Sequence, residues 1–220
     1  MLTIYDVETL KSTKLKVIKR KTKKSQILLY DTKRRANDFM NMIKYRKNGT
    51  FDDIPHFIVT KMGNIYQLFD TNHTAKTFGD PKTDNKIIKI AVENLGWLNK
   101  NTINGFLFNW IGDPYRSEPF IKSWRNHYYW DRYNDDQMKA IVDLCEHLTD
   151  THKIDKKIVP SQGFLQNVYN FTGIVCKSNF SDIYTDINPS FNFRLFFNNG
   201  EEKFNKLRPH QKNVEHIKET

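Results

Sequence analysis

The chain has 220 residues, which suffices for one domain with a buried core and is too short for two domains of ordinary size. Hydrophobic residues make up 38% and aromatic residues 14%, a globular composition whose core must contain many rings. No stretch approaches the roughly 20 apolar residues of a membrane span, so no membrane partner is expected. The formal charge of +10 predicts attraction to polyanions, whether nucleic acid, wall polymers or an acidic protein surface.

The N-terminus and the cysteines bear on the cellular compartment. Residues 1–16 lack the basic, apolar and small-residue order of a secretion signal. Cys145 and Cys176 supply neither a disulfide framework nor a paired metal-binding motif. We therefore expect a protein without a signal peptide that folds in a reducing cytoplasm.

The N-terminal part of the chain predicts two strands and a helix. Residues 14–24 alternate lysines with Leu, Val and Ile, which is typical of a half-exposed strand in a basic N-terminal extension, 1–25. A solvated strand face is favoured there over a nucleic-acid-binding stripe. Residues 26–31 form an apolar run typical of a buried strand. A helix should follow, because one helical face collects Ala36, Phe39, Met40 and Ile43.

The middle of the chain predicts a hairpin and a central strand. Residues 56–60 and 65–69 are rich in strand-forming residues, and Gly63 and Asn64 between them suit a tight turn. Residues 86–93 are almost continuously apolar, as in a strand covered on both faces. The elements therefore indicate an α/β fold with a central mixed β-sheet flanked by helices.

The remaining chain predicts one long helix between less regular segments. Residues 101–133 are aromatic-rich and punctuated by Gly and Pro, which indicates an irregular but ordered insertion. Asn134 should cap the next helix, with Gln137 three residues on, and the apolar stripe of that helix comprises Met138, Ile141, Val142, Cys145 and Leu148. A short strand at Ile158 and Val159 follows. We expect the domain to span 26–197 and residues 198–220 to form a polar tail.

Four stretches in this order resemble the zinc-dependent N-acetylmuramoyl-L-alanine amidase and peptidoglycan-recognition family. They are ILLYDT at 27–32, HFIVTKMGNIYQLFD at 56–70, IAVENLGW at 90–97 and TDINPSF at 185–191. The hairpin followed by ENLGW is specific as a combination, although neither part is specific alone. The resemblance covers most of 26–197, with a longer insertion at 101–133 than in compact members. It implies the amidase fold, with a sheet between helices.

The resemblance also implies a zinc site, and this sequence departs from it. Active members hold a tetrahedral zinc through two His and a third Asp, Cys or His, leaving one position for water. Tyr30 stands where the first His is expected. Ser161 stands at the second, or Ile174 in an alternative register. Asp186 is the one retained ligand position, so zinc is expected only if the site is rebuilt.

The catalytic glutamate of the family and a rebuilt metal site leave alternatives open. The family's Glu corresponds to Ala91 if ENLGW anchors the comparison and to Glu93 if the apolar run does, and the two positions share a strand face. His73, Asp31 and Cys176 could join Asp186 at a metal, although they lack ligand spacing. His56 matches a family histidine that is not a ligand and is expected to be packed and hydrogen-bonded. His147 and His152, five apart on the helix, make no metal pair.

The insertion at 101–133 mixes rings with arginines, which favours two interpretations. Its rings pack in a core, or they form a surface that stacks on sugars or bases. The candidate groove residues are Trp110, Trp124, Arg125 and Trp130.

The sequence leads to one main functional hypothesis and two alternatives. The main hypothesis is a catalytically degenerate amidase-fold protein from a phage, made in the host cytoplasm, that binds peptidoglycan or muropeptides or is built into the virion beside structural proteins. The first alternative is an active amidase that cleaves the muramoyl–L-alanine bond with Asp186 and Glu93. The second is a regulator that binds an RNA polymerase or nucleic acid, which the charge of +10 permits.

Overall fold

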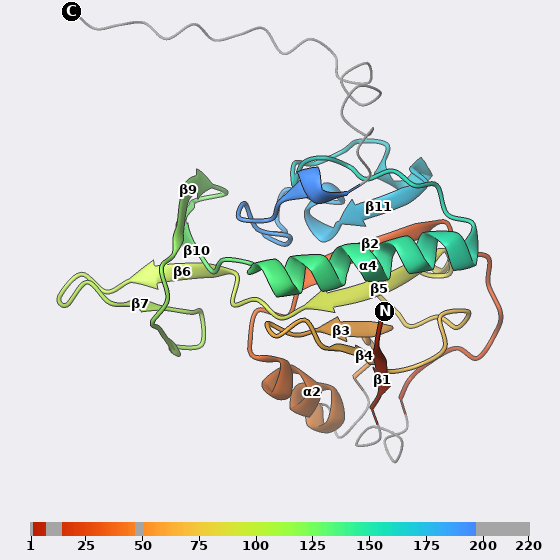
Figure 1. The fold of residues 1–220 in the computed structure, drawn as a ribbon, viewed down its shortest axis with the longest axis horizontal. Coiled ribbons are helices and arrows are strands. Elements are labelled where there is room, and N and C mark those ends of the chain that lie inside the picture. Colours follow the sequence, from red (N-terminus) through yellow and green to blue (C-terminus); the bar gives the residue numbers. More distant parts are fainter. Residues whose placement is uncertain (1, 8–14, 47–50, 197–220) are drawn as a thin grey trace, which may run out of the picture.

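The computed structural model describes residues 2–7, 15–46 and 51–196 and is built around a six-stranded sheet (Figure 1). The strand order is β1-β4-β3-β5-β2-β11. The strands are β1 (Ile4–Asp6), β2 (Gln26–Asp31), β3 (Phe57–Val59), β4 (Ile65–Gln67), β5 (Ile87–Val92) and β11 (Gly173–Cys176). β3 and β4 form the predicted antiparallel hairpin, and the other neighbours pair in parallel. The predicted mixed sheet is confirmed.

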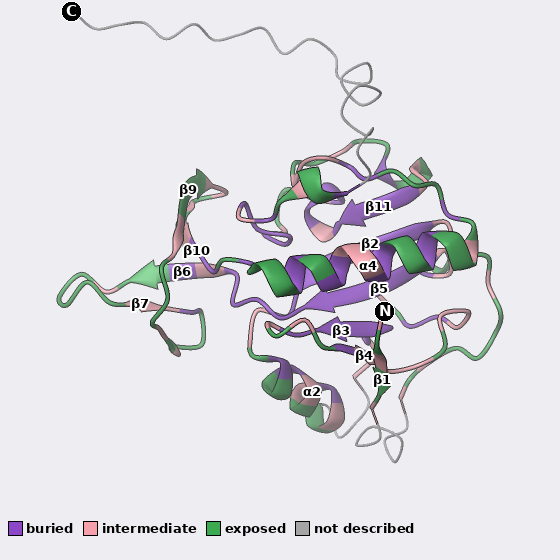
Figure 2. Ribbon diagram, viewed as in Figure 1, coloured by how far each residue is buried: buried purple, intermediate pink, exposed green. Residues whose placement is uncertain are grey.

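The two central strands, β2 and β5, are buried along their whole length, as their continuous apolar sequences predict (Figure 2). On one face, Ile27 and Leu29 of β2 pack with the long helix α4 (Asp135–His152). On the other face, Leu28 and Tyr30 pack with α2 (Ala36–Tyr45). Successive side chains of β2 therefore point into different cores. Tyr30, near the end of the strand, packs on the α2 side.

Helix α4 begins where the capping pattern predicts. The Asn134 side chain accepts a hydrogen bond from the backbone N–H of Gln137 at 2.9 Å. The Gln137 side chain does not close a reciprocal capping box. It donates instead to the carbonyl of Glu93 at 2.8 Å, so it ties the start of α4 to the end of β5.

The insertion at 101–133 is ordered, but it is not irregular. With β6 it builds a second sheet of five strands in the order β8-β7-β6-β10-β9, which projects from the main body (Figure 1). We call this sheet the arm. Its strands are β6 (Trp97–Lys100), β7 (Leu107–Phe108), β8 (Pro114–Tyr115), β9 (Phe120–Trp124) and β10 (His127–Trp130). Its strands pair antiparallel. Each strand is short, and Gly and Pro interrupt the segment, so none has enough alternating residues to be predicted as a strand from the sequence.

Two strand predictions are wrong. The described part of 14–24 makes only an isolated bridge between Ile18 and Thr74. The alternating lysines there reflect a solvated segment, and Lys24 is an exception, buried with its ammonium bonded to the carbonyls of His73 and Asn85. Ile158 likewise makes only a bridge, to Ile174.

The strand that pairs with β2 is β11, whose first residue is Gly173. This glycine has φ +128°, and a Cβ there would lie 2.4 Å from the carbonyl oxygen of Lys157. Only glycine fits this close approach. The remaining short helices are α3 (Pro81–Asp84), η2 (Val168–Asn170), η3 (Lys177–Asn179) and η4 (Phe193–Leu195). No helix in the described parts of the chain is long and apolar enough to cross a membrane, and the polar tail predicted at 198–220 lies outside them.

Candidate functional site

The carboxyl ends of β2 and β11 bring a tyrosine and a lysine together. The two strands are parallel, and Cys176 is paired with Leu29, so the next residues, Lys177 and Tyr30, are neighbours. The ammonium nitrogen of Lys177 lies 5.3 Å from the Tyr30 ring centroid and 5.1 Å from that of Tyr184. Both distances are within the range of cation–π contacts.

Tyr30 is buried, with 5% of its surface exposed. Its hydroxyl has no hydrogen-bond partner among the described residues. Burial, with the negative charges of Asp53 and Asp186, raises the pKa of the phenol well above its usual value. The side chain is therefore a neutral phenol, which is a poor metal ligand.

Asp186 lies in the loop beyond β11 and already has a cationic partner. Its carboxylate pairs with the Lys33 ammonium at 3.0 Å and its side chain is 3% exposed. Lys33 also donates to the Thr185 hydroxyl at 3.1 Å. The retained ligand position is thus neutralised by a lysine of this chain.

The two residues expected at the second ligand position lie in a loop and in the core on the α4 side. Ser161 lies in the loop after Ile158, where its carbonyl accepts a bond from the Asn179 side chain at 2.9 Å. Ile174 is fully buried in the core on the α4 side, whereas Tyr30 lies on the α2 side. Lys177 was not predicted, because no pattern in the sequence indicates which later segment pairs with β2.

The two alternatives for the catalytic glutamate also have definite places. Ala91 is paired with Tyr30 and is buried beside it in the same core. Glu93 follows β5, and its carboxylate accepts a hydrogen bond from the backbone N–H of Lys61 at 2.9 Å. Glu93 therefore stabilises the turn between β3 and β4.

The residues considered for a rebuilt metal site are divided among separate environments. The Asp31 carboxylate accepts a bond from the Tyr133 hydroxyl, and burial, with the charge of Asp186, raises its pKa well above the usual value. Burial likewise raises the pKa of the Cys176 thiol. His73 offers its carbonyl to Lys24 and to His56. Within the described residues, no group of three or more His, Cys, Asp or Glu side chains could hold a metal ion.

His56 is a packed, hydrogen-bonded histidine, as predicted. Its Nδ1 accepts a bond from the backbone N–H of Lys89 at 2.9 Å, and its Nε2 lies 3.2 Å from the carbonyl of His73. His56 is 1% exposed, and its ring centroid lies 4.3 Å from that of Phe69 in a tilted arrangement. His147 and His152 make no pair, and His152 bonds to the Thr71 hydroxyl at 2.8 Å.

The arm reaches the site through two of its candidate groove residues. Trp110 is 45% exposed, donates from its indole nitrogen to the carbonyl of Lys33 at 2.7 Å, and lies under the guanidinium of Arg34 at 5.3 Å. Arg125 covers the ring of Trp124 at 4.6 Å and bonds to the carbonyls of Ser178 and Ser181.

Trp130 cannot belong to such a surface. Its side chain is fully buried in the arm, where its indole nitrogen donates to the carbonyl of Lys122 at 2.8 Å and its ring packs against Trp124. Some rings of the insertion therefore form a core and others lie at the surface, and stacking of the exposed rings on a ligand stays a prediction.

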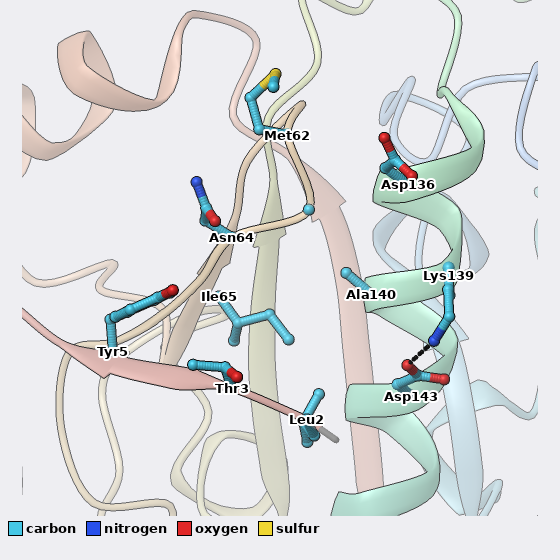
Figure 3. Close-up of a pocket in the computed structure, with 11 residues that line it drawn as sticks. Leu2, Thr3, Tyr5, Met62, Asn64, Ile65, Asp136, Lys139, Ala140 and Asp143 are labelled. Carbon is cyan, nitrogen blue, oxygen red and sulfur yellow. Dashed lines mark hydrogen bonds and ion pairs between the residues drawn. The ribbon is translucent and has the colours of Figure 1, made fainter.

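A cavity of about 260 Å³ lies elsewhere, between β1, the β3–β4 hairpin and α4 (Figure 3). Leu2, Met62 and Ile65 contribute apolar groups, and Lys139 and Asp143 of α4 form an ion pair at its wall. None of the predicted site residues lines it.

Residues 22–169, more than half of the chain, match the family described as N-acetylmuramoyl-L-alanine amidase. The chain belongs to this family. Tyr30, Glu93 and Ser161 lie inside the matched region, whereas Lys177 and Asp186 lie beyond it. No curated protein matches the sequence.

Solved structures are similar to this chain at low sequence identity. The ectodomain of the Drosophila transmembrane receptor PGRP-LCa is similar over 88% of this chain and 95% of that chain, with 10% identity and a TM-score of 0.50. The endolysin N-acetylmuramoyl-L-alanine amidase LysCS from Clostridium intestinale is similar over 94% and 96%, with 17% identity and a TM-score of 0.49. At such identities the likeness concerns the fold alone.

The family is usually zinc-dependent, and the residues of this chain do not fit the metal. A catalytic zinc needs three protein donors with available lone pairs. Here the corresponding region offers a neutral phenol, an ammonium and a carboxylate already paired with Lys33. A positively charged lysine beside Tyr30 also repels a divalent cation.

Proposed function

We propose that this chain is an amidase-family protein that binds peptidoglycan without hydrolysing it. The observation that carries the proposal is the contact between Lys177 and Tyr30 at the adjoining ends of β11 and β2. Lys177 and Tyr30 can donate hydrogen bonds to a carbonyl oxygen, but without a metal these residues do not generate the hydroxide that attacks it. A protein that has lost hydrolysis can still bind peptidoglycan, because the fold and the surface around Tyr30 and Lys177 are kept.

The arm supports the binding part of the proposal. Trp110 presents a half-exposed indole whose nitrogen is held by the Lys33 backbone, and Arg34 lies over its ring. An indole face held in place stacks on the apolar face of a sugar ring at low entropic cost. We therefore expect the glycan strand to lie along Trp110 and the peptide stem near Lys177.

The test has a binding arm and a hydrolysis arm. The full chain should sediment with purified peptidoglycan sacculi, and Trp110→Ala should reduce the bound fraction several-fold. Tyr45→Ala is the matched control, because Tyr45 is another exposed ring, on α2 and 65% exposed. In the second arm, muropeptides incubated with protein and excess zinc should yield no free peptide stem, as monitored by mass spectrometry.

The main competing function is an active zinc amidase, and the same experiment separates the two. Stoichiometric zinc in the purified protein, together with release of peptide stems that chelation abolishes, would replace the proposal by the active enzyme. Failure to sediment with sacculi would overturn the binding part. A virion protein or an RNA polymerase as partner stays a prediction from the sequence that no contact of the described residues favours.

A further inference from the structure

The two carboxylates whose negative charge acts on Tyr30, those of Asp53 and Asp186, each have a cationic partner, and Asp53 is paired with Lys89 at 3.0 Å. Asp186 is paired with Lys33 at 3.0 Å, and Asp182 is paired with Arg125 at 3.1 Å. Lys177 has no carboxylate within ion-pair distance in the part of the chain that the structure describes, and its ammonium contacts only the rings of Tyr30 and Tyr184. One cation therefore remains without a counter-charge.

A second, independent feature points to a missing partner at the same place. The Tyr30 hydroxyl is buried and has no hydrogen-bond partner among the described residues. Buried polar groups are almost always paired, so this hydroxyl keeps a hydrogen bond available for a ligand atom that reaches it. Because the phenol stays neutral, its O–H can donate a hydrogen bond to an anion.

We propose that Lys177 and Tyr30 form a metal-free site for a carboxylate of the ligand, which the proposed function makes a carboxylate of the peptide stem. The Lys177 ammonium pairs with the carboxylate, and the Tyr30 hydroxyl becomes its second donor when the lysine side chain turns toward the ligand. The proposal rests on the proposed function and adds the chemical group that the site selects.

The surroundings favour a carboxylate over a neutral amide. Lys177 is half-buried and held by two rings, so an ion pair there is less screened by water than one at an open surface. The nearby carboxylates of Asp53, Asp182 and Asp186 are each already paired with a cation, so they repel the ligand less than free carboxylates would. A carboxamide of the same shape lacks the charge that Lys177 requires.

The experiment compares two ligands that differ in this one group. Binding of N-acetylmuramoyl-L-alanyl-D-glutamine, whose α-carboxylate is its only charged group, and of the corresponding α-carboxamide to the full chain is measured by titration calorimetry in the presence of a chelator. We expect the acid to bind about tenfold more tightly than the amide, the effect of one partly buried ion pair. Raising the salt concentration should narrow the difference.

Variants locate the effect. Lys177→Met should remove the preference for the acid, and Lys177→Arg should keep most of it. Lys44→Met is the matched control, because the Lys44 ammonium also lies over a tyrosine ring, that of Tyr45 at 5.2 Å, on α2. Tyr30→Phe should weaken binding of the acid more than that of the amide. Circular dichroism and melting curves check that each variant folds.

The outcomes separate this inference from the proposed function. Equal binding of acid and amide, with sedimentation on sacculi intact, would overturn the carboxylate site and leave peptidoglycan binding standing. A preference that survives Lys177→Met would also overturn it, as would binding that the chelator abolishes. Absence of binding to both compounds and to sacculi would overturn the two proposals together.

Discussion

Burial in the folded protein shifts the pKa values of two polar side chains, His56 and Asp31. His56 is enclosed between β5 and the carbonyl of His73, and burial, reinforced by the positive charge of Lys24, lowers its pKa well below 6.5. Asp31 is enclosed on the α4 side of β2 with Tyr133, and burial raises its pKa. Each residue therefore makes stability depend on pH, in opposite directions.

His56 should make the protein less stable in mild acid. Below pH 6.5, the unfolded chain binds a proton at His56 that the native state does not, so the free energy of unfolding falls as pH falls through that window. One such group contributes at most about 1.4 kcal/mol per pH unit. Urea unfolding between pH 7 and 5 should show a shallower slope for His56→Gln than for the wild type. His147→Gln, at an exposed position on α4, is the control, and identical slopes for all three proteins would refute the prediction.

Asp31 should have the opposite effect. Above pH 3.8 the unfolded chain loses the Asp31 proton while the native state retains it, so this residue's contribution to stability decreases as pH rises. Asp31→Asn removes the effect and keeps an oxygen that can accept the Tyr133 hydroxyl bond. The stability of the variant relative to the wild type should therefore increase between pH 4 and 7, as measured by chemical denaturation. A constant difference over this range would contradict the assignment.

At the scale of elements, the position of β11 decides what surrounds Tyr30. Parallel pairing with β2 carries the chain to Lys177, and η3 begins there. Gly173 allows this strand to start directly against the carbonyl of Lys157. Strand β11, and not the loop that contains Ser161, therefore supplies the residue that contacts Tyr30.

Gly173→Ala should be strongly destabilising. The added Cβ would lie 2.4 Å from the Lys157 carbonyl oxygen, at a φ of +128° that residues other than glycine rarely adopt. We expect a loss of about 3 kcal/mol or more in the free energy of unfolding, because strain and a backbone clash combine. Gly112→Ala is the matched control, since its φ is +88° but no atom lies within 4 Å of the new Cβ. Equal losses for the two variants would show that the close approach at Gly173 is unimportant.

At the scale of the whole molecule, the fold keeps the ends of β2 and β11 and the loop at Asp186 in one region. Tyr30 and Lys177 are in contact, and Asp186 contributes to the raised pKa of Tyr30. The arm approaches this region through Trp110 and Arg125. We propose that this region corresponds to the family's ligand set, with changed chemistry.

If this placement is right, two substitutions should create a metal site. Tyr30→His with Lys177→His removes the ammonium and supplies two imidazoles near Asp186, and two His with one carboxylate is a known zinc donor set. We expect about one zinc per chain by elemental analysis, and none for the wild type. Tyr30→His with Ser161→His is the matched control and should bind no zinc. Zinc in the control alone would place the second position at Ser161.

The sequence by itself determined the mixed sheet between helices, the hairpin, the capped helix α4 and the packed state of His56. These features depend on local patterns, namely apolar period, turn residues and capping side chains. It also located Tyr30 and Asp186, which belong to motifs that are contiguous in the chain. Only the tertiary structure decided that Lys177 lies beside Tyr30, that Lys33 neutralises Asp186 and that Trp130 is buried. These depend on strand pairing and long-range contacts, which join residues far apart in the chain and leave no periodic signal in the sequence.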